Sequence, residues 1–337
     1  MTKAVRGDPR VARALLDGGV DGLADSRLDN LRRLRDGLDP GRVLLLRAPP
    51  PGRGWEAVTL ADGVLCTSPE LGGELAAAAA RLRPGRPWRV ILPVDLGDLR
   101  EGVLPEELPR AAVELERELA RASGRPDPDR RAHVAGLATN LACLAGVVPT
   151  RAHLEELVAL ARETGRVLGR SLSVSGGNTA VLPLLLREGV PPGLDDLRVG
   201  EGILLGRDSL ERRPLPGCHV DAFRFVATVL EVGKKPSAPV GRTAEDAFGG
   251  HPVFADRGRR RRAVLAAGRQ DCVPDGLSPL AEGVEIVGAS SDHLVVDVEE
   301  YSGPIGPGTE LGFSVGYACL LQAMTSADVA KVYVGES

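Results

Sequence analysis

The run Arg89-Val-Ile-Leu-Pro-Val-Asp95 is almost wholly apolar, and a stretch of helical period follows it over residues 107–122. A short strand without alternation of apolar and polar residues is typical of a parallel sheet that is covered on its faces. Similar short runs occur at residues 22–24, 42–46, 64–66, 133–137, 172–175 and 197–200. The pattern therefore predicts seven parallel strands before residue 215.

Stretches of helical period separate most of these runs. They lie at residues 8–18, 26–37, 69–83, 107–122, 151–166 and 178–188. Repeated strand and helix units predict either an open doubly wound sheet or a closed barrel of eight strands. If Met1-Thr-Lys-Ala-Val5 is the end of a further strand, truncated at its start, the count reaches eight. We therefore expect a TIM-type α/β barrel.

The pattern of apolar residues changes after about residue 215. Helical periodicity fades, and short apolar runs separated by Gly and Pro occur at residues 223–232, 263–267, 284–287, 294–298 and 310–315. A helical turn over residues 320–324 and a strand over residues 330–334 are expected at the end. This pattern predicts an all-β domain over residues 216–337, after a barrel domain over residues 1–215.

Charge and cysteine content exclude several classes of protein. The 42 basic and 46 acidic residues give a net charge of −4, so no broad basic surface for nucleic acid or membranes is expected. The run Arg257-Gly-Arg-Arg-Arg-Arg262 is either a basic patch that binds nucleic acid or another anion, or a solvated turn. The five cysteines form no CxxC pair, which argues against a disulfide framework and a structural metal site. With no signal peptide or apolar span, a cytoplasmic protein is expected.

Polar residues follow the predicted strands, where a barrel binds its ligands. They are Lys3, Arg100, Asn140, Ser175 with Gly176, Arg198, and Gly200-Glu-Gly-Ile203. Ser175-Gly176-Gly177 and Gly200-Glu-Gly202 can present backbone N–H groups to a phosphate. A phosphate site together with a lysine and two arginines suggests pyridoxal phosphate, whose aldehyde reacts with an amine.

The chain resembles the alanine racemase-like (fold type III) pyridoxal phosphate enzymes, and within them the ornithine racemase branch. The resemblance runs nearly end to end and lies in Ala24-Asp-Ser-Arg27, Val94–Gly102, Val174-Ser-Gly-Gly-Asn178, Leu197–Gly206, Gly268-Arg-Gln-Asp271 and Gly288–His293. It implies a cytoplasmic, homodimeric, pyridoxal 5′-phosphate-dependent racemase of ornithine or another basic amino acid. It also implies that the β domain of the partner completes each active site.

The resemblance assigns roles to the residues of the barrel. Lys3 matches the lysine that holds the cofactor and moves the α-proton of the substrate. Arg100 matches an arginine near the phenolate oxygen of the cofactor and the substrate carboxylate, and Asn140 a residue beside the ring. Arg198 matches the arginine that faces the pyridine nitrogen. Ser175, Gly202, Ile203 and Tyr317 match phosphate-binding positions.

The second proton-transfer group is left open. Where alanine racemases have Gly-Tyr-x-Asp, this chain has Gly268-Arg-Gln-Asp271, and an arginine is a poor base. Asp271, Cys272 and His293 are the nearby candidates for this group, while Arg269, Asp292 and His293 are expected to meet substrate. A basic substrate calls for an acidic partner, for which Asp246, Asp271 and Asp292 are the alternatives.

Two other functions remain open at this point. A non-catalytic pyridoxal phosphate carrier is one, although residues 216–337 count against it because single-barrel carriers lack a β domain. The other is an inactive racemase homologue truncated at its N-terminus, because the family resemblance implies about 30 more residues before the lysine. The motifs of the related metal-dependent threonine aldolases and decarboxylases are not found.

Overall fold

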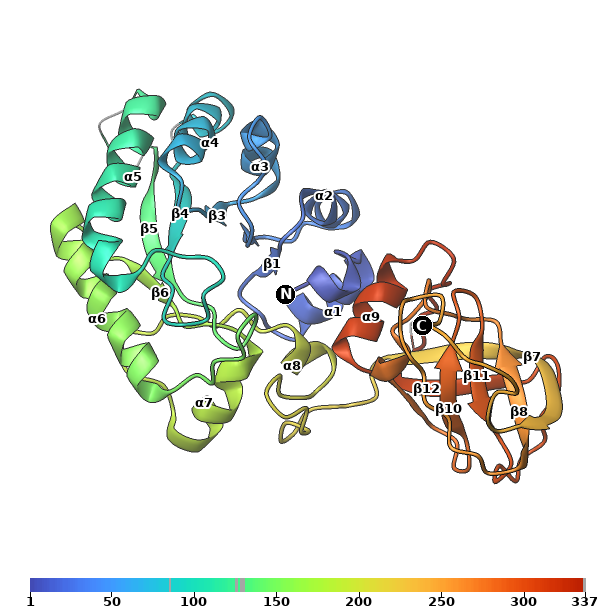
Figure 1. The fold of residues 1–337 in the computed structure, drawn as a ribbon. Coiled ribbons are helices and arrows are strands. Elements are labelled where there is room, and N and C mark those ends of the chain that lie inside the picture. The colour runs from blue at the N-terminus through green and yellow to red at the C-terminus, as the bar shows by residue number, and fades with distance from the viewer. Residues whose placement is uncertain (85, 125–126, 128–130, 336–337) are drawn as a thin grey trace. The chain divides into compact units, whose positions relative to one another are not determined.

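Among the residues that the structure describes, six short parallel strands form the first sheet, in chain order (Figure 1). They are β1 (Leu23–Asp25), β2 (Val43–Leu45), β3 (Gly63–Leu65), β4 (Trp88–Pro93), β5 (Ala132–Ala138) and β6 (Ser173–Ser175). The computed structural model describes residues 1–84, 86–124, 127 and 131–335. It divides into two compact units, Met1–Cys218 and His219–Ser337, which are described separately.

The first unit also contains helices, several of which lie along the outer face of this sheet (Figure 1). They are α1 (Pro9–Asp17), α2 (Leu28–Gly37), α3 (Gly54–Leu60), α4 (Pro69–Leu82), α5 (Leu108–Ser123), α6 (Arg151–Leu168), α7 (Leu182–Glu188) and α8 (Glu201–Leu204), with the short 3₁₀ turns η1 (Lys3–Val5), η2 (Pro105–Glu107) and η4 (Thr179–Val181). Fully buried side chains such as Trp88 and Leu31 fill the layer between sheet and helices. This arrangement confirms the predicted α/β barrel class, with most helices close to their expected bounds.

A buried ion cluster joins α5 to the sheet. The Glu116 carboxylate accepts hydrogen bonds from Val134 N at 2.9 Å and from the Arg131 guanidinium at 2.7 Å, and it pairs with Arg170 at 2.5 Å. Burial favours the neutral acid, but these three donors outweigh it and hold the pKa of Glu116 below its ordinary value of 4.5. The carboxylate therefore remains ionised where two guanidiniums need a counter-charge.

The first two residues close the gap between the ends of the sheet. Thr2 N donates to Ala24 O of β1 at 3.0 Å, and Met1 N donates to Val199 O at 2.7 Å. Residues 197–200 do not form the predicted strand, because the ladder with β6 is limited to one bridge between Ser175 and Asp196. The prediction that Lys3 ends a strand is also wrong. The chain turns after Thr2, so Lys3 begins η1 instead.

The second unit is built on an antiparallel sheet with the order β10-β11-β8-β7-β12-β9. Its strands are β7 (Arg224–Pro236), β8 (Arg259–Leu265), β9 (Leu277–Pro279), β10 (Glu285–Ala289), β11 (Leu294–Asp297) and β12 (Glu310–Val315), accompanied by η5 (Pro274–Gly276) and α9 (Tyr317–Thr325). Phe313, Leu265 and Val296 lie in its own apolar core. The predicted β-rich character of this part is confirmed.

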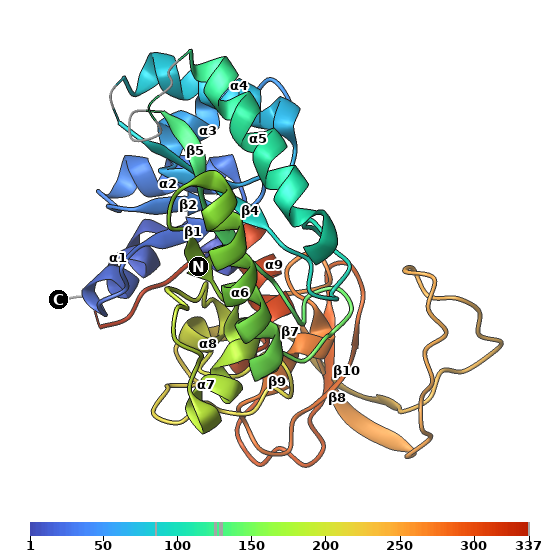
Figure 2. The same cartoon turned by 90° about the vertical axis from the view of Figure 1, so that its left-hand side faces the viewer.

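Two local predictions in the second unit are wrong. Residues 259–262 of the arginine run belong to β8 rather than to a turn, because their backbone pairs with β7 in the antiparallel sheet. The Arg260 side chain also pairs with the buried Asp297 at 2.9 Å. Residues 330–334 form no strand, and Val332 and Val334 are largely exposed. A long segment, residues 237–258, joins β7 to β8 and stands out from the sheet (Figure 2).

Candidate active site

Lys3 lies in a turn at the edge of the sheet where the parallel strands end. Its carbonyl accepts a hydrogen bond from Arg6 N at 3.1 Å, and Arg6 adopts the left-handed conformation that closes the turn. The side chain of Lys3 is half-buried. The other predicted barrel residues follow β4, β5 and β6 or the segment after them, so the topology brings them to the same edge.

Arg100 lies in the loop after β4 and contacts the loop after β5. Its Nη1 donates to Cys143 Sγ at 2.7 Å, and its guanidinium pairs with Glu101. The loops are joined more firmly by Asp98, which is 1% exposed. Its carboxylate accepts from Leu144 N at 2.8 Å and from the backbone N–H groups of Cys143 and Ala145.

The pKa of Asp98 reflects this backbone cradle. Burial by itself raises the pKa, but the N–H groups of residues 143–147 outweigh it and hold the pKa of Asp98 below its ordinary value. Sequence reasoning missed this residue because the donors are backbone groups 45 residues away along the chain. The carboxylate fixes the loop that carries Arg100 to the loop that follows β5.

Asn140 is held by Asn178 and keeps one buried polar group unused. Asn178 Nδ2 donates to Asn140 Oδ1 at 3.0 Å and to Leu141 O at 2.8 Å. Asn140 Nδ2 is buried and has no hydrogen-bond partner within the described part of the chain. Buried donors are almost always paired in native proteins. This amide therefore favours a site for a ligand that supplies an acceptor.

Arg198 is buried beneath the ends of β5 and β6. Its Nη2 donates to Thr139 O at 2.5 Å, and its Nη1 contacts the hydroxyl of Ser175, which in turn binds Asp196. Burial lowers the pKa of Arg198 to about 10, with Asp196 and Glu101 opposing that shift. The guanidinium thus stays charged at neutral pH while its position is fixed by carbonyl and hydroxyl groups.

The two glycine turns predicted to bind phosphate are joined by Thr179. Its Oγ1 accepts hydrogen bonds from Gly200 N and Gly202 N, both at 3.2 Å. Gly176 N donates to Asp196 O at 2.9 Å, and Ile203 N donates to Gly200 O at 3.1 Å. The structure thus uses several of the predicted phosphate donors within the protein, and their role toward a phosphate stays a prediction.

In the second unit, most of the predicted residues gather around the turn at 268–271. Arg269 Nε donates to Ala289 O at 3.1 Å, and its guanidinium lies over the ring of Phe248, 4.8 Å from the ring centre. Gln270 Nε2 donates to the exposed Asp292 at 2.6 Å. His293, next to Asp292, is also exposed.

Asp271 and Asp246 have local structural partners. Asp271 accepts from Gly268 N at 3.0 Å and so closes the turn. Asp246 accepts from Gly250 N and Phe248 N, both within 2.9 Å, and these amides lower its pKa, with a smaller contribution from Arg269. Asp246 therefore lies near Arg269, which the sequence did not predict.

Cys272 is an interior residue of the second unit. It is fully buried in the apolar core, where its thiol faces Gly268 O at 3.6 Å and contacts Cys319. A thiol enclosed in this way cannot meet a substrate without local opening, so its position argues against the predicted catalytic role. Tyr317 is half-buried at the start of α9, and its predicted role stays a prediction.

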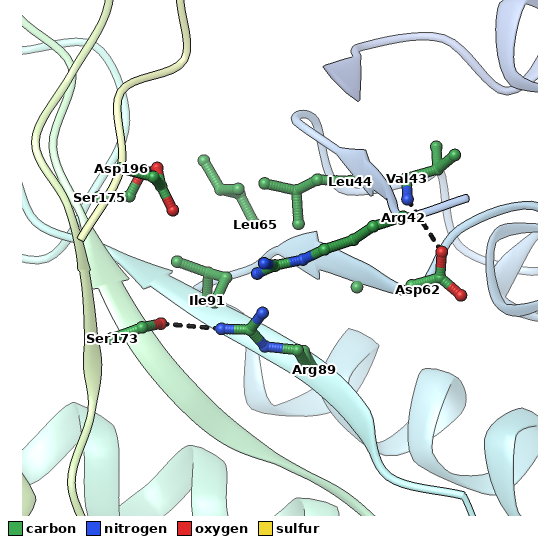
Figure 3. A pocket seen from close by; sticks show the side chains of 11 residues that line it. Arg42, Val43, Leu44, Asp62, Leu65, Arg89, Ile91, Ser173, Ser175 and Asp196 are labelled. Carbon is green, nitrogen blue, oxygen red and sulfur yellow. Dashed lines mark hydrogen bonds between the residues drawn. The ribbon is translucent and has the colours of Figure 1, made fainter. Parts of the chain in front are cut away.

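A small cavity of about 30 Å³ lies on the inner side of the parallel sheet. The guanidinium groups of Arg42 and Arg89 point toward each other there, and Arg89 Nη2 donates to Ser173 Oγ at 2.9 Å (Figure 3). Arg42 precedes β2 and Arg89 lies near the start of β4, so both belong to the amino ends of the strands. The sequence did not point to these two arginines, because ligands are expected at the carboxyl ends of the strands.

Two kinds of feature are absent from the part of the chain that the structure describes. No group of three or more His, Cys, Asp or Glu side chains there could hold a metal ion. No helix in the same residues is both long and apolar enough to cross a membrane.

Comparison with known proteins gives a family match over most of the chain. Residues 1–207 match the family model described as the N-terminal domain of alanine racemase. A lysine racemase of Thermotoga maritima is 37% identical over 334 residues, which cover 99% of this chain and 90% of that protein. An ornithine racemase of Acetoanaerobium sticklandii is 35% identical over 313 residues, or 93% of this chain and 85% of that protein.

Among solved structures, an alanine racemase from Streptomyces lavendulae has the same fold. It superposes with a TM-score of 0.70 at 20% sequence identity, covering 99% of this chain and 89% of that one. The likeness includes both the parallel barrel part and the β-rich part.

Proposed function

The chain belongs to the alanine racemase family, and from this premise we propose that it is a pyridoxal 5′-phosphate-dependent racemase of a basic amino acid, either lysine or ornithine. The observation that carries this proposal is the match of nearly the whole chain to a lysine racemase. The enzyme is an isomerase. Its similarity to an ornithine racemase also supports a basic amino acid as the substrate.

The residues at the carboxyl edge of the sheet fit the cofactor. The unpaired, buried Nδ2 of Asn140 needs an acceptor, and the cofactor has several. Lys3 would hold the cofactor covalently, with Arg100 and Asn140 beside it and Arg198 at its ring nitrogen. Ser175, Gly176, Gly202, Ile203 and Tyr317 are the proposed phosphate-binding residues.

When bound, the cofactor draws electrons from the α-carbon of an amino acid and so acidifies its proton. Lys3 removes that proton or returns it on one face of the α-carbon. Arg198 remains charged and would disfavour protonation of the ring nitrogen, which limits electron withdrawal and suits racemisation over transamination.

Proton return on the opposite face needs a second group. Asp271 and His293 remain the proposed candidates, and the burial of Cys272 makes it the weakest of the three. Asp292 is proposed to receive the distal ammonium group of the substrate, because it is exposed and held by Gln270 and Ser291. Arg269 is proposed to bind the substrate as well.

The proposal includes the assembly of the chain into a dimer. We expect two copies of the chain to form a homodimer in which the β-rich domain, residues 216–337, of one copy serves the barrel, residues 1–215, of the other. No role for nucleic acid or a membrane surface is proposed. The net charge of −4 supports this expectation.

The experiment combines cofactor binding with single-substrate assays. The purified protein is incubated with pyridoxal 5′-phosphate, dialysed, and examined for visible absorbance, with Lys3→Ala as control. The loss of optical rotation is then followed separately for L-lysine, L-ornithine and L-alanine. We expect retained absorbance in the wild type alone and racemisation of the two basic amino acids. Retained cofactor without racemisation of any of the three would contradict the proposed activity.

A further inference from the structure

Ala24-Asp-Ser-Arg27 contains the end of β1 and the two residues after it, and it has no role in the proposed reaction. Asp25 ends this strand and is fully buried, although a buried carboxylate is costly unless donors surround it. Burial raises the pKa of Asp25, while hydrogen bonds from Thr2, Asn30 and the backbone oppose that shift. Packing alone therefore does not explain why an acidic side chain is buried at this position.

The donors to Asp25 come from the residue before Lys3 and from the start of α2. Thr2 Oγ1 donates to Asp25 Oδ2 at 2.8 Å. Asn30 Nδ2 and Arg27 N donate to Oδ1 at 2.9 and 3.0 Å. Thr2 is also fully buried, so its hydroxyl has little access to water as an alternative partner. The carboxylate thus links the Lys3 segment to α2.

The backbone of the Lys3 segment depends on Thr2. Thr2 N donates to Ala24 O at 3.0 Å, and Thr2 O accepts from Val5 N and Gly7 N, both at 3.1 Å. Gly7, at φ +65°, lies directly against α2, where an added Cβ would be 2.4 Å from Asn30 O. The turn that carries Lys3 is therefore fastened to the β1–α2 connection at both of its ends.

From this geometry we propose that Asp25 and Thr2 are positioning residues that hold the Lys3 turn in place for cofactor binding. Neither residue takes part in proton transfer. The hydroxyl of Thr2 and the carboxylate of Asp25 fix the backbone from which Lys3 extends, so their loss allows the turn to move while the barrel stays folded. The proposal rests on the proposed function, because it assumes that Lys3 holds pyridoxal 5′-phosphate.

The first test replaces Thr2 with residues of nearly the same size. Thr2→Val removes the hydroxyl without changing the volume, and Thr2→Ser keeps the hydroxyl. Each protein is loaded with pyridoxal 5′-phosphate and treated with borohydride, and the fraction of labelled Lys3 is measured by peptide mass spectrometry. The rate of cofactor loss on dialysis is measured in parallel. We expect Thr2→Val to lose cofactor at least about tenfold faster, and Thr2→Ser to stay within about twofold of the wild type.

The second test replaces the carboxylate. Asp25→Asn keeps the shape of the side chain but turns an N–H group toward one of the existing donors. It is expected to lower the labelled fraction of Lys3 as Thr2→Val does. Circular dichroism shows whether each variant is folded. If Thr2→Val does not fold, Asp25→Asn tests the proposal independently.

Two residues distant from Lys3, the buried Thr164 and the half-buried Asp62, supply controls. Thr164→Val removes a buried hydroxyl of α6 that has no partner within the described chain. Asp62→Asn alters a carboxylate that binds Val43 N at 2.9 Å, Arg35 and Arg83 at the amino ends of the strands. Both controls are expected to lose cofactor at the wild-type rate, even if they unfold at lower temperature.

The outcomes separate the positioning role from the proposed function. If the wild type labels at Lys3 and Thr2→Val matches it, the positioning role is wrong and the function stands. Equal losses in Thr2→Val and the two controls would also overturn it, because the effect would then be one of general stability. If the wild type does not label at Lys3, both proposals fail together.

Discussion

Glu116 is a single acidic side chain that balances two guanidiniums in the interior of the barrel unit. Arg131 is 6% exposed, so removal of the carboxylate would take away the acidic group that balances the charge of its guanidinium. Breaking a buried pair from one side costs about 3–5 kcal/mol, more than the pair is worth when intact. Stability near α5 and β5 should therefore depend on the ionisation of this one group.

We predict that Glu116→Gln lowers the free energy of unfolding by about 3 kcal/mol at neutral pH. Because the folded pKa of Glu116 lies below 4.5, its contribution is present above that pH and is lost as pH falls through the folded pKa. The deficit of the variant should accordingly shrink as the pH falls below 4.5. Urea titrations followed by the fluorescence of buried Trp88 measure the free energy of unfolding of the wild type and of the variant at each pH. A difference between them that does not depend on pH would contradict the prediction.

At the scale of elements, Thr179 joins two turns that come from different strand and helix units. Its hydroxyl binds two backbone amides, Gly200 N and Gly202 N, and the residue is 4% exposed. The turn after β6 and the start of α8 are thereby held in one arrangement. As a result, the backbone N–H groups of the two turns stay at a fixed distance from each other for binding a ligand.

We predict that Thr179→Val destabilises the protein by about 1–3 kcal/mol, because two buried amides lose their acceptor. Amide hydrogen exchange should speed up at Gly200 and Gly202 before it does in β4 or β5. Thr179→Ser, which keeps the hydroxyl, is the control. Unchanged exchange at both glycines in Thr179→Val would show that other acceptors replace the hydroxyl.

Elements with a repeated pattern were predictable from the sequence. The helix over residues 151–166 was expected because Thr150 marks its start and its apolar residues recur at helical spacing. The structure extends it to Leu168 and gives it a capping box at Thr150 and His153. The strand expected at 197–200 was wrong because apolar character alone does not ensure a ladder. The turn at Lys3 was missed because it depends on Thr2, Asp25 and Gly7, which come together only in the folded chain.

On the scale of the whole molecule, each unit has its own apolar core and contributes its own group of predicted site residues. Lys3, Arg100, Asn140 and Arg198 belong to the first unit, and Arg269, Asp271 and Asp292 to the second. The sequence located these residues because they follow strands or match family motifs. It did not reveal Asp98 or Thr179, whose partners are backbone amides that no side-chain pattern records.

The proposed homodimer predicts complementation between inactive variants. Lys3→Ala and Arg269→Ala each remove one part of a shared site, so a mixed dimer contains one site with both parts intact. Equal mixtures that re-pair at random should regain about a quarter of wild-type racemase activity. The activity is measured after dissociation and reassociation, with each variant alone as control. Mixed dimers that form but remain inactive would contradict sharing of the site.

The carboxylate of Asp98 also has a consequence for how this protein can be altered. Because it is bonded to the backbone of residues 143–145, the loops after β4 and β5 cannot change length independently without breaking those bonds. Engineers who transplant loops from relatives to change the preferred amino acid should move residues 94–104 and 139–149 as one cassette. Natural insertions in either loop would be tolerated only together with a compensating change in the other.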